Sequence, residues 1–179
     1  KIEKKTLLPY DEKIFKFLSD FSNGLNNFKD CKKFPDILTL AFFCRKANLL
    51  NLKRKFLVSL ENKRLPLGLI FHITPSNIPT NFVYSLIFGL INGNSNIVKV
   101  PSKNFEQVEI ISKVMNQTLK KHNEIKKMIT IVKYNNEDRF TEDISKKCDA
   151  RLIWGGDNSI KNIRKFELNS RAFDLTFAD

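Results

Sequence analysis

From residue 67 onward, short runs of apolar residues alternate with stretches that have the spacing of amphipathic helices. Residues 67–73, Leu-Gly-Leu-Ile-Phe-His-Ile, form a continuous apolar run, as expected for a strand covered on both faces. This alternation predicts an α/β fold with a doubly wound, mostly parallel sheet and helices on both faces. The expected strands are 67–73, 96–100, 128–132, 150–154 and 174–178, and the expected helices between them are 80–91, 106–121, 138–147 and 158–165.

The first 65 residues lack this alternation and are expected to be helical. Apolar side chains between Ile14 and Phe21 recur at helical spacing, which predicts a helix over residues 11–21. Further helices are expected over residues 37–47 and 50–60. We therefore divide the chain into an N-terminal helical segment, residues 1–65, that packs on the core, and an α/β domain, residues 66–179.

The formal net charge of +12 is concentrated near the N-terminus. Residues 1–65 contain 15 Lys and Arg against 7 Asp and Glu, whereas residues 66–103 contain two Lys and no carboxylate. A basic helical face can be a solvated surface, or it can attract nucleic acid, membrane phosphates or an acidic protein. No aromatic stacking motif or recognition-helix pattern accompanies the charge, so no nucleic-acid ligand is expected.

The sequence lacks the usual marks of a membrane, secreted or metal-binding protein. No apolar run reaches the roughly 20 residues that a transmembrane helix needs, and the N-terminus lacks the apolar core of a signal peptide. Cys31, Cys44 and Cys148 are odd in number and show no CxxC spacing, and with His72 and His122 they make a poor metal set. Such cysteines suit a reducing compartment, so we expect a cytoplasmic protein without a metal site.

In a doubly wound sheet the loops that follow the strands meet at one edge, where ligands bind. The first of these loops, residues 74–79, holds Asn77 between two prolines, just before a helix. The rigid loop could present the Asn77 amide to a developing oxyanion, or Asn77 could simply cap its own helix. The local sequence leaves both interpretations open.

The loops after the second and fourth expected strands suit a phosphate-bearing ligand. Lys99, Ser102 and Lys103 bring two cations and a hydroxyl to the sheet edge. Gly155-Gly156 precedes Asp157 at the start of a helix, so the backbone can approach a phosphate and free helix N–H groups can contact it. This segment matches neither the GxGxxG nor the Walker pattern, and a plain strand–helix turn is the alternative.

Taken in order, these segments resemble the cofactor-binding domain of the aldehyde dehydrogenase superfamily. Residues 75–79, Pro-Ser-Asn-Ile-Pro, resemble the PWNFP segment of that superfamily, and residues 93–99 resemble its GN-x-V-V-x-K segment. Residues 152–156 stand where the superfamily has an F-T-G-S turn, and residues 167–179 where ELGGK runs into IVFADAD. The segments most similar to the acyl-CoA reductase group, of the bacterial bioluminescence fatty-acid reductase type, are residues 68–72, 93–98 and 152–157.

The resemblance implies an aldehyde-dehydrogenase-like, Rossmann-like nicotinamide cofactor domain over residues 66–179. Asn77 would be the oxyanion donor, Lys99 would contact the adenosine ribose or its phosphate, and the two glycines would approach the pyrophosphate. Glu167 stands where hydrolytic members keep a general base, which an acyl reductase does not need. The implied cofactor-binding residues are Thr74, Pro75, Ser76, Lys99, Ser102, Lys103, Gly155, Gly156 and Asp157.

Several departures from the superfamily pattern modify these expectations. Ser76 replaces the Trp of PWNFP, and Gly156 replaces the Ser of the turn. Lys103 replaces a Glu that holds the ribose diol in NAD-preferring members, and a Lys there could pair with a 2′-phosphate, so we expect NADPH rather than NADH. The nucleophilic Cys of the superfamily lies downstream of the ELGGK-like segment, and Cys31, Cys44 and Cys148 do not match it. The chain is therefore expected to bind cofactor without turnover.

The resemblance implies an enzyme that reduces a long-chain fatty acyl thioester to a fatty aldehyde through a Cys acyl-enzyme. The implied partners are that substrate, an acyl-protein synthetase and, for the full-length enzyme, further copies in a homo-oligomer. Two alternatives stay open: a reductase of another acyl donor, such as an acyl phosphate or a semialdehyde precursor, and a non-catalytic basic binding module that uses residues 1–65.

Overall fold

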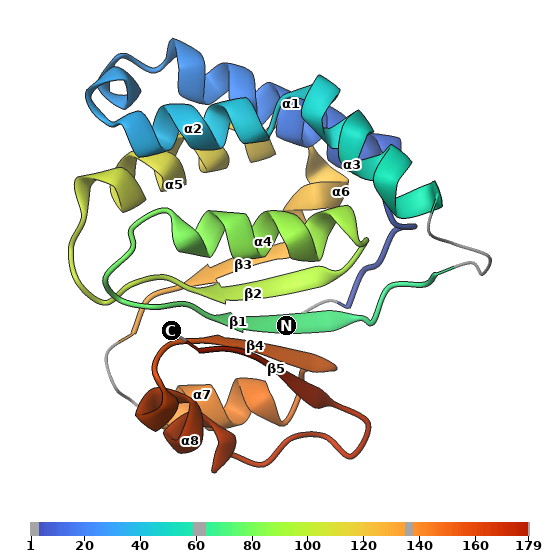
Figure 1. Cartoon of the computed structure of the whole chain (residues 1–179), viewed down its shortest axis with the longest axis vertical. Coiled ribbons are helices and arrows are strands. Elements are labelled where there is room, and N and C mark those ends of the chain that lie inside the picture. Colours follow the sequence, from blue (N-terminus) through green and yellow to red (C-terminus); the bar gives the residue numbers. More distant parts are fainter. Residues whose placement is uncertain (1–3, 59–63, 135–137, 179) are drawn as a thin grey trace.

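The computed structural model describes residues 4–58, 64–134 and 138–178, and a five-stranded sheet organises them (Figure 1). Neighbouring strands all pair in parallel, in the order β3-β2-β1-β4-β5. The predicted α/β fold with a parallel sheet is confirmed, and each predicted strand is present. The strands are β1 (Leu69–Ile73), β2 (Ser95–Lys99), β3 (Ile129–Val132), β4 (Ala150–Trp154) and β5 (Phe173–Phe177).

Helices cover both faces of the sheet (Figure 1). One face carries α4 (Asn81–Ile91) and α5 (Glu106–Leu119), and the other carries α7 (Asp138–Ser145) and α8 (Asp157–Arg164). Because successive side chains of a strand point to opposite faces, the strands contribute to two hydrophobic clusters. Val98 packs in the cluster that includes α4 and α5, and its neighbour Ile97 packs with α7 and α8.

The N-terminal segment forms a helical layer outside α4 and α5. It consists of α1 (Glu12–Asn27), a 3-10 turn η1 (Lys29–Lys33), α2 (Pro35–Phe43) and α3 (Lys46–Val58). The α1 side chains Ile14, Phe17 and Leu25 are fully buried in the same hydrophobic cluster as α4 and α5. Helix α1 continues beyond its predicted end at residue 21 because Leu25 extends its buried stripe. The division of the chain at residue 65 stays a prediction.

Some boundaries differ from the sequence prediction. Helix α2 ends at Phe43, where the Cys44 and Arg45 N–H groups bond to the carbonyls of Leu40 and Phe42. Residues 59 and 60 of the expected third helix lie outside the described residues. The sequence analysis missed η1 and the short α6 (Asn123–Lys126), because one turn of helix is too short to show a period.

Strand β1 begins at Leu69 rather than at residue 67 because of a local contact. Gly68 has φ +123°, and a side chain at this position would collide with the Asp149 carboxylate. That carboxylate accepts the Leu69 N–H at 2.7 Å and also pairs with Lys4 at 2.9 Å. Asp149 thereby fixes where the central strand starts.

Candidate functional site: a cleft at the carboxyl edge of the sheet

Strands β1 and β4 are neighbours, but the helices that follow them lie on opposite faces of the sheet (Figure 1). The loop after β1 leads to α4 on one face, and the loop after β4 leads to α8 on the other. The two loops diverge and leave a crevice at the carboxyl ends of the strands, which is the point where α/β sheets bind ligands. A cleft of about 850 Å³ lies there.

The cleft is lined by the loops after β1, β2 and β4 and by residues of α7 and α8. It brings together most of the residues that the sequence predicted: Thr74, Pro75, Ser76, Asn77, Lys99, Ser102, Gly155 and Gly156. The sequence analysis missed Thr141 on α7 and Ser159, Asn162 and Ile163 on α8, which also line it. The last three recur at helical spacing after the Gly-Gly turn, and this pattern could have identified them.

The first loop is tied to the neighbouring strand and presents an exposed amide. The Thr74 hydroxyl donates to the Lys99 carbonyl at 2.8 Å, so the ends of β1 and β2 are held together. Ser76 and Asn77 are exposed at the cleft. The N-cap of α4 is Thr80, and within the described residues the Asn77 side chain makes no hydrogen bond. Asn77 therefore does not cap α4, and its amide is available to a ligand.

Lys99 stands at the carboxyl end of β2, beside an aromatic ring. Its ammonium lies 4.5 Å from the centroid of the Tyr134 ring, a cation–π distance. The Tyr134 hydroxyl bonds to Thr141 of α7 at 2.8 Å, and burial raises the pKa of this phenol above its usual range. Tyr134 thus stays neutral at ordinary pH, so the positive charge of Lys99 is not cancelled by this neighbour.

The Gly155-Gly156 turn leaves backbone open to the cleft. Gly155 has φ +150°, which disfavours any other residue there, and a Cβ added to Gly156 would meet no atom within 4 Å. Gly156 is also the N-cap of α8 and has no side chain to occupy the first N–H groups of that helix. Open space before a helix N-terminus, in a cleft that Lys99 also lines, fits an anionic group such as a pyrophosphate.

Three predicted site residues lie outside the cleft lining. Lys103 is exposed, with its ammonium 5.4 Å from the centroid of the Phe105 ring. Asp157 is exposed at the first position of α8, and Glu167 is exposed between α8 and β5. The roles assigned to these three residues stay predictions.

A buried polar chain ends at the cleft. The Trp154 indole N–H donates to the Ser85 hydroxyl at 3.2 Å, Ser85 bonds to His72 Nδ1 at 2.7 Å, and His72 Nε2 bonds to Asn96 Oδ1 at 2.9 Å. Burial lowers the pKa of His72 to about 4, so its ring is neutral and one nitrogen donates while the other accepts. Since Asn96 Oδ1 only accepts, Nε2 donates to it and Nδ1 accepts the Ser85 proton. The signal that could have predicted this polar chain is a histidine inside a buried strand, because a buried imidazole needs hydrogen-bond partners.

The three cysteines lie in the hydrophobic interior, away from the cleft lining. Burial raises the pKa of Cys44 to about 12 and that of Cys148 to about 11, and it also raises the pKa of Cys31. A thiol must ionise to act as a nucleophile, so none of the three is activated in this arrangement.

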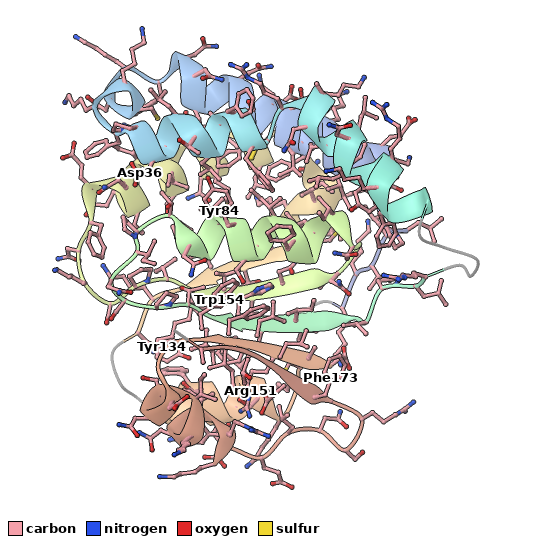
Figure 2. The ribbon with its side chains drawn as sticks, viewed as in Figure 1. Asp36, Tyr84, Tyr134, Arg151, Trp154 and Phe173 are labelled. Atoms are coloured by element: carbon pink, nitrogen blue, oxygen red, sulfur yellow. The ribbon has the colours of Figure 1, made fainter. Side chains whose placement is uncertain are left out.

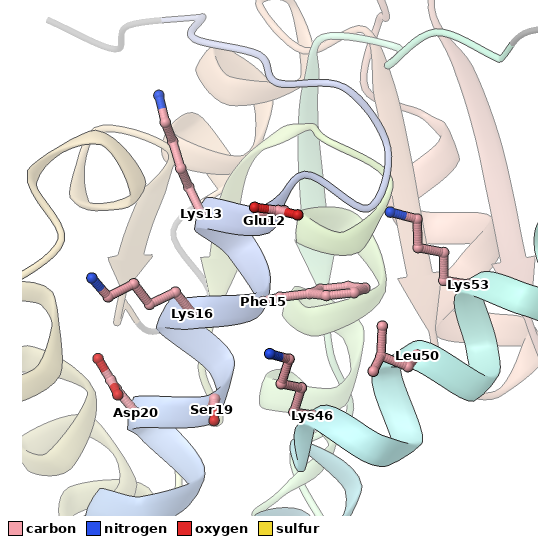
Figure 3. A pocket seen from close by; sticks show the side chains of 9 residues that line it. All are labelled: Glu12, Lys13, Phe15, Lys16, Ser19, Asp20, Lys46, Leu50 and Lys53. Carbon is pink, nitrogen blue, oxygen red and sulfur yellow. The ribbon is translucent and has the colours of Figure 1, made fainter.

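A second groove lies between α1 and α3 (Figure 3). It encloses about 690 Å³, with Phe15 and Leu50 among its walls, and it carries charges of both signs: Lys13, Lys16, Lys46, Lys53, Glu12 and Asp20. It contains none of the predicted site residues. Within the described ranges, no helix is long and apolar enough to cross a membrane, and no three His, Cys, Asp or Glu side chains are grouped as for a metal ion.

The fold is similar to that of solved aldehyde dehydrogenases. The structure superposes on glyceraldehyde-3-phosphate dehydrogenase GapN from Methanocaldococcus jannaschii, complexed with NADP, with a TM-score of 0.65 and 15% identity, over 93% of this chain and 41% of that chain. A lactaldehyde dehydrogenase superposes with a TM-score of 0.69 and 13% identity, over 96% of this chain and 40% of that chain. The NADP-dependent glyceraldehyde-3-phosphate dehydrogenase from Bacillus halodurans, complexed with NADP, superposes with a TM-score of 0.59 and 14% identity, over 96% of this chain and 41% of that chain. The chain thus spans less than half the length of these proteins.

The fold is that of an α/β domain of the aldehyde dehydrogenase type. A family model for acyl-CoA reductase (LuxC) matches residues 41–178, which is more than half of the chain. The chain belongs to the acyl-CoA reductase (LuxC) family, and the resemblance identified from the sequence is confirmed. A comparison with curated protein sequences finds no match.

Proposed function

We propose that this chain is the cofactor-binding part of an NADPH-dependent reductase that converts a long-chain fatty acyl thioester into a fatty aldehyde. The observation that carries the proposal is the cleft at the carboxyl edge, where Lys99 and the Gly155-Gly156 turn border the same space in a member of the acyl-CoA reductase family. The bound cofactor supplies the hydride. The Cys that forms the acyl-enzyme belongs to the whole protein and is none of the three buried thiols.

Each lining group has a role in this proposal. The N-terminus of α8 and the open backbone at Gly156 hold the pyrophosphate. Lys99 pairs with the adenosine ribose or its phosphate, and Thr74 fixes the backbone of Lys99 through the 2.8 Å hydrogen bond. The exposed amide of Asn77 donates a hydrogen bond to the oxyanion that develops on the substrate carbonyl.

Replacing Gly156 with Val tests the cofactor site. Gly156 has φ −67° and open space around its Cβ position, so the variant should fold while its side chain fills the cradle. Calorimetric titration should show NADPH affinity falling by at least about tenfold, as for the loss of an ionic or charge-assisted contact. Ser170→Val, which adds the same side chain at an exposed loop position, is the control. Equal NADPH affinity in the two variants would contradict the proposed site.

In this proposal Lys103 sets the preference for NADPH over NADH, because its cation can pair with the 2′-phosphate of NADPH. We expect the chain to bind NADPH more tightly than NADH and Lys103→Glu to remove or reverse this preference. The measurement is the ratio of the two dissociation constants. Tighter binding of NADH by the unmodified chain would exclude this assignment.

The role of Asn77 is tested in the full-length protein. Asn77→Ala should lower kcat by about 100- to 1,000-fold, as for the loss of one oxyanion donor, and should leave NADPH affinity nearly unchanged. Unchanged turnover would rule the role out. A thioester reductase and a reductase of another acyl donor would both use this cleft, so the site does not distinguish them. Comparing turnover of acyl-CoA with turnover of acyl phosphate does.

The remaining parts of the proposal concern the whole protein. An acidic partner, such as an acyl-protein synthetase, would suit the basic helices of residues 1–65. A homo-oligomer of the full-length enzyme and a cytoplasmic location complete the proposal. Nucleic-acid affinity that falls steeply with salt would favour the basic binding module instead.

A further inference from the structure

The groove between α1 and α3 is lined by two helical stripes that face each other (Figure 3). The stripe on α3 consists of Lys46, Leu50 and Lys53, and the stripe on α1 includes Phe15 and Lys16. Lining positions recur every three or four residues, so each wall extends over about two turns, or roughly 10 Å. A groove of about 690 Å³ with walls of this length can take the side chains of a third helix.

Helix α4 lies between this groove and the cleft at the carboxyl edge of the sheet. Figure 2 labels Trp154, which lines the cleft, below α4, whereas α1 and α3 lie above it. The groove and the cleft share no lining residue. A ligand of the groove would therefore use none of the residues assigned to the cofactor.

The α3 wall carries positive charge that no neighbouring carboxylate cancels. Among the residues that the structure describes, Lys46 and Lys53 form no ion pair. The Lys53 ammonium instead lies 5.7 Å from the centroid of the Phe15 ring, a cation–π distance. Between the two lysines, Leu50 is 40% exposed. This wall thus offers an apolar side chain with one cation on either side of it.

The α1 wall adds less net charge, because two of its charged groups are already paired. Lys13 pairs with a carboxylate of α6 at 2.8 Å, and the Asp20 carboxylate bonds to His122 at 2.9 Å. Within the described ranges, Lys16 and Glu12 form no ion pair, and both are exposed. The unpaired charges of the groove lining are therefore three ammonium groups against one carboxylate.

We propose that this groove docks an acidic amphipathic helix of a partner protein. Such a helix lays an apolar stripe against Phe15 and Leu50 and places carboxylates on either side of the stripe, opposite Lys46 and Lys53. The inference deepens the proposed function, because it gives the acidic partner proposed there a defined place on the chain.

Other occupants fit the groove less well. A second copy of this chain carries the same formal net charge of +12 and is repelled. A nucleic acid would set its phosphates against the exposed Leu50 and the carboxylate of Glu12. A membrane surface is too flat to enter a groove between two helices.

The test uses a fluorescent amphipathic peptide of about 16 residues, which is long enough for four helical turns, with Leu on one stripe and Glu on both sides of it. Fluorescence anisotropy on the 179-residue chain should show saturable binding that weakens as the salt concentration rises, because salt screens exposed ion pairs. A peptide of the same composition, with its order scrambled so that the stripe is lost, should bind at least about tenfold more weakly.

Variants of the α3 wall locate the binding site. The double variant Lys46→Glu, Lys53→Glu should bind the peptide at least about tenfold more weakly. The control is the double variant Lys147→Glu, Lys161→Glu, which makes the same change in net charge at exposed positions on the opposite side of the sheet. Leu50→Ser should also weaken binding, although it leaves the net charge unchanged.

Equal binding of the ordered and scrambled peptides, or equal affinity in the two double variants, would overturn the proposal. Polyglutamate that binds as tightly as the ordered peptide would do the same, since it would show attraction by charge alone. Binding to vesicles of anionic lipid without peptide binding would assign the face to a membrane instead.

NADPH titration keeps this inference separate from the proposed function. The Lys46→Glu, Lys53→Glu variant should bind NADPH as the unmodified chain does, because the cleft is untouched. Failure of the peptide to bind a chain that binds NADPH contradicts only the docking groove. Failure of NADPH to bind a chain that binds the peptide contradicts only the cofactor site.

Discussion

His72 is a titratable side chain with no exposure to solvent, and it lies between Ser85 and Asn96. Its neutral form accepts one proton and donates another, so both ring nitrogens are satisfied. A charged ring would have to donate from both nitrogens inside an apolar core. Burial is the main reason why its pKa falls to about 4, and the hydrogen bond to Asn96 opposes the fall.

This low pKa predicts a loss of stability in acid. A histidine of the unfolded chain takes up its proton near pH 6.5, whereas His72 in the fold does so only near pH 4. Its contribution to the free energy of unfolding is therefore complete above about pH 6.5 and is lost as the pH falls toward 4, by on the order of 3 kcal/mol. Urea unfolding at several pH values measures it.

His72→Asn provides the comparison, because it keeps a polar side chain that does not titrate. The fall in unfolding free energy between pH 6.5 and 4.5 should be smaller in this variant than in the unmodified chain. Parallel curves for the two proteins would show that His72 is not the cause of the acid sensitivity.

Two secondary-structure elements, β4 and the edge strand β5, are joined by a buried ion pair. Arg151 is 1% exposed and donates two hydrogen bonds to the Asp174 carboxylate, at 2.7 and 3.0 Å. The same guanidinium also reaches Ser145 of α7 at 2.9 Å and the carbonyl of Phe166 at 3.3 Å. One side chain thus links two strands, a helix and the segment that leads to Glu167.

Removing Asp174 should lower the free energy of unfolding more than removing Arg151. Asp174→Ala leaves a positive charge buried without its carboxylate and should lower the free energy of unfolding by about 3–5 kcal/mol. Arg151→Met should cost less, because Asp174 is more exposed and still has Arg164 at 3.5 Å. Urea unfolding measures the loss of unfolding free energy in each variant. A larger loss for Arg151→Met than for Asp174→Ala would contradict this account.

Helix α4 approaches β1 and β2 closely because Gly89 has no side chain. A Cβ at this position would collide with Asn96 and lie 3.0 Å from His72. The glycine in the last turn of the helix therefore makes room for the buried polar chain that leads to Trp154. A helical pattern alone gives no reason for a glycine there.

For the whole molecule, the cleft couples ligand binding to stability. A ligand that binds only the folded chain stabilises it by about 2.7 kcal/mol at a concentration 100 times its dissociation constant. For a domain of this size that corresponds to a rise in Tm of roughly 5–10 °C. The Tm should therefore rise with NADPH concentration in the unmodified chain and much less in the Gly156→Val variant. A Tm that is independent of NADPH in both would argue against binding in the cleft.

The sequence by itself determined the fold class, the order of the strands along the chain and about half of the cleft lining. Alternating apolar runs and helical stretches depend only on neighbours in the chain, so their period is visible in the sequence. The prolines around Asn77 and the glycines 155 and 156 are local signals of the same kind. They also carried the resemblance to the family, which the family match confirms.

Only the tertiary structure decided which side chains are partners. Trp154 and Ser85 are 69 positions apart and meet because the strand order places β4 beside β1, which α4 covers. The same order pairs Arg151 with Asp174 and brings the face of α8 to the cleft. Contacts between distant residues depend on how the sheet is assembled, and the local hydrophobic period carries no information about that assembly.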